Sequence, residues 1–124
     1  MGFLLFILAL TLGIILIPIA ILYTIIRCLW GHQIGVALKS IDYKFHVLAA
    51  SFDQYGNVAL KELLNDTCTK NSTNPFGNIR QTISMVLGHN LLAGTLSKTG
   101  KLVVFIVGKA HCTKWALLDP TTKN

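Results

Sequence analysis

An uncharged apolar run near the start of the chain limits the folds that this sequence can adopt. Residues 3–26, FLLFILALTLGIILIPIAILYTII, contain no charged side chain, and the first one in the sequence is that of Arg27. At about 1.5 Å of rise per residue the run makes roughly 36 Å of helix, enough to cross a ~30 Å hydrocarbon core with some tilt. Pro18 lies inside the run, and a membrane helix tolerates proline as a kink. We therefore predict that residues 1–30 form a transmembrane anchor.

A cleaved signal peptide is the alternative interpretation of this run. Such a peptide has a basic start, an apolar core of roughly 7–15 residues and a cleavage site of small residues. Here no Lys or Arg precedes the run, the run is longer, and it is followed by Arg-Cys-Leu-Trp at 27–30. The retained anchor is the favoured interpretation.

The charges beside the run predict its orientation. Arg27, Lys39 and Lys44 follow it, whereas no basic side chain precedes it. The positive-inside rule then places the N-terminus outside and the C-terminal part on the cytoplasmic side of the membrane. The three cysteines, at 28, 68 and 112, are too few for a disulfide framework and fit a reducing compartment.

The next segment has the pattern of an amphipathic helix. Its apolar residues recur at intervals of three and four, which places them on one side of a helix. This stripe consists of Ile34, Leu38, Ile41, Phe45, Leu48 and Phe52. We expect it to face a protein core, a partner or a membrane surface.

Polar segments divide the rest of the chain. The stretch DQYGNV (53–58) interrupts the helical pattern, and residues 65–78 have the composition of a loop. Further helices are expected over 79–93 and 101–118, although residues 102–107 have strand propensity and could instead lie on a bilayer surface. We therefore predict an all-α protein: a single transmembrane helix, a small helical domain over 31–118 on the cytoplasmic side, and a tail at 119–124.

A histidine and a cysteine stand side by side at His111 and Cys112. On a helix adjacent side chains point about 100° apart, so the two cannot easily hold one zinc ion or form a catalytic dyad. The remaining Cys and His residues form no CxxC or HxxxH pair, the spacing that structural zinc sites usually have. We predict buried packing for this pair, and neither a metal nor a cofactor for the chain.

Charged residues offer little for catalysis or nucleic-acid binding. The five acids include no credible acid–base pair, and no phosphate-binding or dinucleotide-binding motif occurs, so an enzyme is not expected. The net charge of +6 is spread over separated lysines without adjacent stacking aromatics. It is better explained by topology and by attraction to anionic lipid headgroups, and neither nucleic acid nor a small-molecule substrate is an expected partner.

Three short segments, FDQYGNV, QTISMVLG and HCTKWAL, resemble a family of small phage and prophage proteins. The family pattern has a D-Q-x-x-N segment, an E-T-I-S-S-R-x-G segment and a terminal H-C-x-x-A segment, and this chain follows it in order over about residues 52–116. Gln81 and Val86 depart from the pattern, where it has an acid and an arginine. The residues quoted for the match are Asp53, Gln54, Asn57, Thr82, Ile83, Ser84, Gly88, His111, Cys112 and Ala116, of which Ala116 lies one position beyond the alanine of the pattern.

The resemblance implies a phage origin and no particular activity. It further implies that His111 and Cys112 pack against the segments of Asp53 and Asn57 and of Thr82 and Ser84. We expect a structural or interaction role in which the chain tethers a membrane to virion or partner protein subunits, with the lipid bilayer and other subunits (this chain included) as partners. The alternatives are a holin-type lysis protein and an accessory subunit of a host membrane complex.

Overall fold

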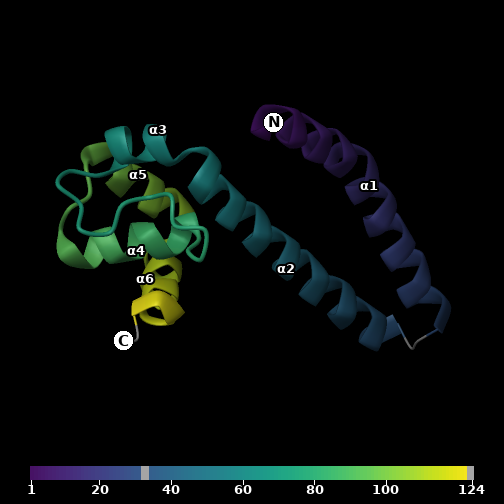
Figure 1. Cartoon of the computed structure of the whole chain (residues 1–124). Helices are drawn as coiled ribbons and strands as arrows, with labels where there is room; N and C mark the ends of the chain where they lie inside the picture. Colours follow the sequence, from purple (N-terminus) through teal and green to yellow (C-terminus); the bar gives the residue numbers. More distant parts are fainter. Residues whose placement is uncertain (32–33, 123–124) are drawn as a thin grey trace. The chain divides into compact units, whose positions relative to one another are not determined.

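A computed structural model of the chain describes residues 1–31 and 34–122 (Figure 1). The described residues form six α-helices and one short 3-10 helix, and no strand. The all-α prediction, with a long apolar helix at the start and a small helical domain after it, is confirmed. The chain divides into two compact units, Met1–Val47 and Leu48–Asn124.

The first unit contains α1 (Gly2–Gly31) and the first half of α2 (Ile34–Ala59). α1 includes Pro18 and has no buried residue. The end of α1 and the start of α2 are in contact, since the Cys28 thiol lies 3.8 Å from the Ser40 hydroxyl and Ala37 is buried. The two helices therefore touch where their small side chains allow close approach.

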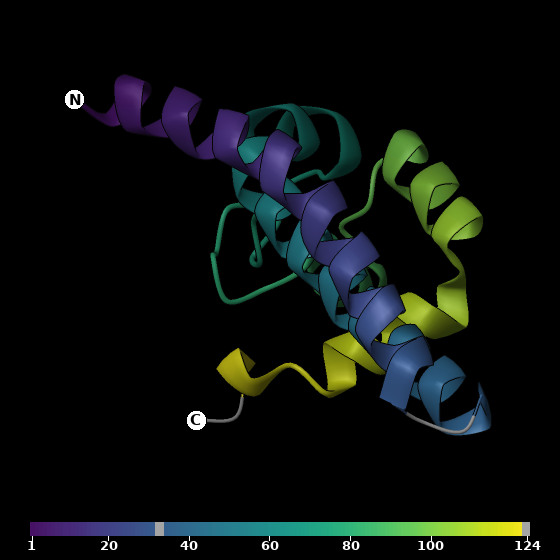
Figure 2. The ribbon, with the colours of Figure 1, turned by 90° about the vertical axis from the view of Figure 1, so that its right-hand side faces the viewer.

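The second unit is built around α4 (Ile83–Ala93). This helix is apolar on nearly every side, and such a helix is stable only when other elements cover it. α6 (Lys109–Leu117) and α5 (Lys98–Val107) pack against it, and α3 (Lys61–Cys68) packs against α5. Figure 2 shows α5, in light green, at one side of this unit, followed by α6. The apolar core consists of Cys68, Phe76, Val86, Leu87, Leu96, Val104 and Cys112.

Local capping fixes where the short helices begin and end. The Thr82 hydroxyl accepts a hydrogen bond from the Met85 N–H at 3.2 Å, so α4 begins at Ile83 rather than at the expected residue 79. Gly94 ends α4 in the left-handed conformation, at φ 72°, and Ser97 caps α5. The single helix expected over 101–118 is two helices, because Gly108 has φ 107° and breaks it.

Two glycines permit close crossings of helices in the second unit. A Cβ atom at Gly88 would lie 2.1 Å from the Cys112 carbonyl oxygen, and one at Gly100 would lie 2.1 Å from the Cys68 carbonyl oxygen. Only glycine fits at such distances. These contacts hold α4 against α6 and α5 against the end of α3.

The remaining predicted boundaries lie at the ends of the anchor, of the amphipathic helix after it and of the helical domain. α1 ends at Gly31, close to the expected end of the anchor, but the first compact unit extends to Val47. The expected interruption over 53–58 is wrong, because α2 continues to Ala59. The expected tail begins with Asp119, which is fully buried and followed by the 3-10 helix Pro120–Thr122. Lys123 and Asn124 lie outside the described residues.

Candidate functional site

α1 is the one helix in the described part of the chain that is long and apolar enough to cross a membrane. Its 30 residues span about 45 Å at the usual helical rise. None of them is buried, so α1 is not a core helix of this chain. Most of its leucine and isoleucine side chains are exposed, which is typical of a helix surrounded by lipid.

The apolar stripe on α2 is largely uncovered. Ile41 and Leu48 are half-buried, whereas the other four members are exposed. The core-facing interpretation is therefore wrong for Ile34, Leu38, Phe45 and Phe52. The physical reason is that α3, the 69–82 loop and α4–α6 supply the core of the second unit, and α2 contributes its polar side, with Asp53 and Asn57, instead.

The residues predicted to pack around Cys112 come together in the second unit. The Asp53 carboxylate accepts hydrogen bonds from the Ser84 hydroxyl at 2.8 Å and from its N–H at 3.4 Å, at the start of α4. Thr82 caps the same helix. Asn57 is fully buried and donates to the carbonyl oxygens of Asn78 and Gln81.

Cys112 is fully buried where α6 crosses α4. Burial raises the pKa of its thiol, and the negative charge of Asp53 raises it further. A protonated, enclosed thiol is unreactive and packs as a small apolar side chain, so the packing prediction holds for Cys112.

The packing prediction is wrong for His111. Its side chain is exposed, and its ring lies edge-on to Trp115 with 6.1 Å between the centroids. The reason is the helical geometry that separates neighbouring side chains by about 100°: with Cys112 facing α4, His111 points away.

Asparagine side chains hold the 69–82 loop against the helices. Asn65 accepts from the Phe76 N–H at 2.8 Å and donates to its carbonyl oxygen at 3.1 Å, which replaces a pair of backbone hydrogen bonds. Asn90, on α4, donates to the Asn74 carbonyl oxygen at 2.9 Å and accepts from Thr95. The loop is therefore ordered by side chains rather than by a sheet.

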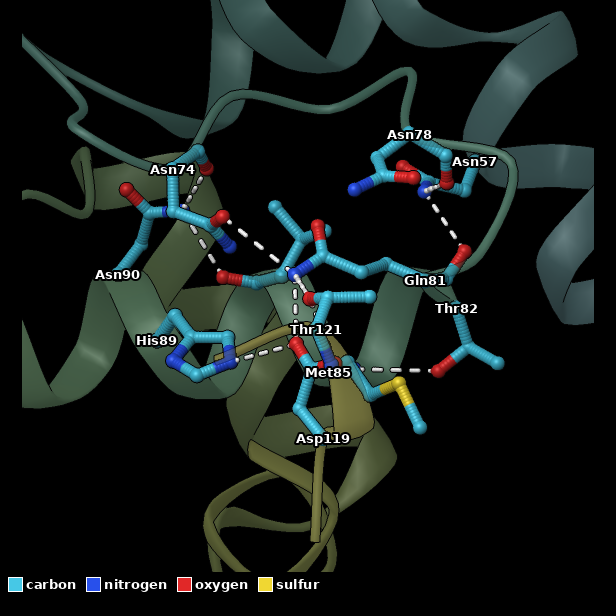
Figure 3. Close-up of polar contacts among 11 residues, drawn as sticks. Asn57, Asn74, Asn78, Gln81, Thr82, Met85, His89, Asn90, Asp119 and Thr121 are labelled. Carbon is cyan, nitrogen blue, oxygen red and sulfur yellow. Dashed lines mark hydrogen bonds and ion pairs between the residues drawn. The ribbon is translucent and has the colours of Figure 1, made fainter. Parts of the chain in front are cut away.

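A buried polar cluster around Asp119 was not predicted from the sequence (Figure 3). The Asp119 carboxylate is fully buried and accepts hydrogen bonds from the Gln81 amide, from His89 Nε2 at 2.8 Å, and from the Thr121 N–H and hydroxyl. Burial acts to raise the pKa of Asp119, but the hydrogen bonds from Thr121, Gln81 and His89 together outweigh it and lower the pKa. The cluster ties the segment after α6 to α4.

The chemistry open to this cluster is limited by its enclosure. His89 and Asp119 form an ion pair when His89 is protonated, and the buried carboxylate also accepts hydrogen bonds from Gln81 and Thr121. Among residues 1–31 and 34–122, no group of three or more His, Cys, Asp or Glu side chains could hold a metal ion. The cluster is suited to holding the fold together, whereas the exposed apolar surfaces of α1, α2 and α5 are suited to binding.

Comparison of the chain with protein-family models, with curated proteins and with solved structures found no match.

Proposed function

We propose that this chain is a single-pass membrane protein of phage-like origin that tethers a membrane to virion or partner protein subunits. α1 is the anchor, and the second unit lies on the cytoplasmic side. The observation that carries the proposal is that α1 is long and apolar and has no buried residue. An exposed apolar surface of this size would cause aggregation in water, and a lipid bilayer covers it.

A binding role is supported further by how the chain uses its reactive groups. The Cys112 thiol is enclosed at a helix crossing, and the Asp119 carboxylate is fully engaged in hydrogen bonds within the second unit. In contrast, apolar side chains on α2 are exposed, Phe45 among them. The stripe on α2 is the surface that we assign to partner subunits.

In a virus with an internal membrane, the cytoplasmic leaflet becomes the face beneath the capsid. A domain on that side would then meet shell proteins. The holin-type alternative requires self-association of the span to open the membrane. α1 offers few polar or small residues for this, with Thr11, Gly13 and Thr24 in its interior.

The substitution Phe45→Ala tests the tether. Phe45 is 45% exposed, so its removal leaves the fold intact and removes a large apolar contact from the stripe. We expect co-purification with virion subunits to fall by about tenfold or more, with membrane insertion unchanged. Tyr43→Ala is the matched control, because Tyr43 is 67% exposed and lies two residues away, about 200° around the helix.

Expression of the wild-type chain alone separates the two membrane roles. A tether leaves the membrane potential of the host cell unchanged, which a potential-sensitive dye reports. Abrupt, timed loss of the potential would favour the holin-type role and contradict the tether.

A further inference from the structure

Three apolar side chains stand out from α5 on one side. Phe105 is 82% exposed, Ile106 75% and Leu102 58%. Positions three and four residues apart are neighbours on a helix, so these side chains form one surface. Gly100 and Val104, on the opposite side of α5, are buried against the second unit. The second unit leaves this apolar surface uncovered.

Basic side chains border this surface. Lys98 and Lys101 precede Leu102 and Phe105 by four residues each, which places them on the same side of α5, and Lys109 follows at the start of α6. All three lysines are exposed, and the structure pairs none of them with a described Asp or Glu. Residues 98–118 contain no acidic side chain at all. The surface is therefore both apolar and positively charged.

We propose that α5 docks on an anionic lipid bilayer, with Phe105, Ile106 and Leu102 at the boundary between headgroups and acyl chains. Lys98, Lys101 and Lys109 contact the headgroup phosphates. This combination of an apolar face and a lysine border is what an interfacial helix needs. The inference deepens the proposed function, on which it rests for the presence of a bilayer close by.

The positive charge of the α5 surface and its covalent connection to the anchor favour a bilayer over a protein as its partner. α2, which joins the anchor to the second unit, is 26 residues long, or about 39 Å, so the bilayer stays within reach of α5 at high effective concentration. A second copy of the chain is the less suitable occupant. A two-fold contact through α5 would bring two lysine borders together, and like charges repel.

A depth-sensitive fluorophore on α5 tests the docking in the full chain. The label is attached through Phe105→Cys in a Cys28→Ser background, in which the remaining Cys68 and Cys112 are buried. The protein is reconstituted through α1 into vesicles of phosphatidylcholine alone or with about 30% phosphatidylglycerol. In the anionic vesicles we expect quenching by aqueous iodide to fall about threefold or more, and quenching by lipid-attached spin labels to rise.

Two controls give the test its specificity. Ile79→Cys is matched in exposure, at 72%, and a label there remains accessible to iodide in both vesicles. The double substitution Lys98→Gln with Lys101→Gln should return the label at position 105 to water. Salt at about 1 M should do the same, because it shortens the electrostatic screening length to about 3 Å. Circular dichroism shows whether the lysine variant keeps its fold.

The outcomes separate this inference from the proposed function. Loss of the protein from vesicles after an alkaline wash would contradict the anchor. If the protein is retained but the label at position 105 is as accessible to iodide as the label at position 79, the docking of α5 is contradicted and the anchor is not. Shielding that depends on protein density and not on phosphatidylglycerol would assign the surface to a second copy and overturn the proposal.

Discussion

The Asp119 carboxylate is buried, yet its hydrogen bonds keep it ionised. Because its pKa is lower in the folded chain than in the unfolded one, its contribution to stability is present above the usual range near 3.8 and is lost as the pH falls through the folded pKa. Asp119→Asn leaves His89 and Thr121 without a charged acceptor. We expect a loss of about 2–4 kcal/mol in the free energy of unfolding at pH 7.

Denaturant unfolding in detergent, followed by circular dichroism at pH 7 and pH 3, checks this prediction. The difference between wild type and Asp119→Asn should shrink at the lower pH. Asp66→Asn changes an exposed acid and serves as the control. An equal loss at both pH values would contradict the electrostatic explanation.

Gln81 is buried beside Asp119 in the polar cluster of the second unit. Its amide donates to the Asp119 carboxylate, so Gln81→Glu would bring two carboxyl groups together in a buried site. Like charges at this distance raise the pKa of the pair above the usual value of about 4.3 for Glu. A group whose pKa is raised by folding contributes stability to the folded chain at pH values below its unfolded pKa. That contribution is lost as the pH rises through the folded pKa.

The variant Gln81→Glu should therefore be less stable than wild type at pH 8 and closer to it at pH 5. Thermal unfolding measured at the two pH values tests this. Equal stability of variant and wild type at pH 8 would show that the two carboxyl groups do not meet.

At the scale of helices, the crossing of α4 and α6 depends on Gly88. A methyl group there would overlap the Cys112 carbonyl oxygen and lie 2.7 Å from the Ala116 side chain, and backbone atoms cannot move aside easily. We expect Gly88→Ala to destabilise the second unit by about 3 kcal/mol or more. Amide hydrogen exchange in α4 and α6 would report the loss.

The matched control for the crossing is Gly35→Ala in α2. Nothing lies within 4 Å of an added Cβ there, so helix propensity alone predicts a gain of about 0.5–1 kcal/mol. Wild-type exchange rates in Gly88→Ala would contradict the close crossing.

At the scale of the whole molecule, the basic residues that follow α1 predict the topology. A reporter fused after Asn124 should be cytoplasmic, because Arg27, Lys39 and Lys44 all follow the run. Green fluorescent protein at this position should be fluorescent in bacteria, and alkaline phosphatase should be inactive. Active alkaline phosphatase at the same fusion point would reverse the proposed orientation.

The sequence by itself determined the features that arise from neighbouring residues. The run at 3–26 has no charged side chain and is long and apolar, so the helix α1 could be predicted from hydropathy alone. Intervals of three and four residues predicted helices, and hence the all-α class. The adjacency of His111 and Cys112 and the missing zinc-ligand spacing predicted packing, which the structure shows for Cys112. These are local patterns, which are readable because a helix repeats its geometry every few residues.

Only the tertiary structure decided which side chains meet across long separations. Gln81 and Asp119 are 38 positions apart, and no local pattern connects them. Asn57 and Gln54 do not end α2 as expected, because their side chains bind the distant 77–81 segment and the helix continues. Which residues of the α2 stripe are exposed, and that Phe105 is exposed, could also not be predicted from the sequence. An apolar periodicity indicates that a face will be covered, but the covering element is chosen by packing between segments.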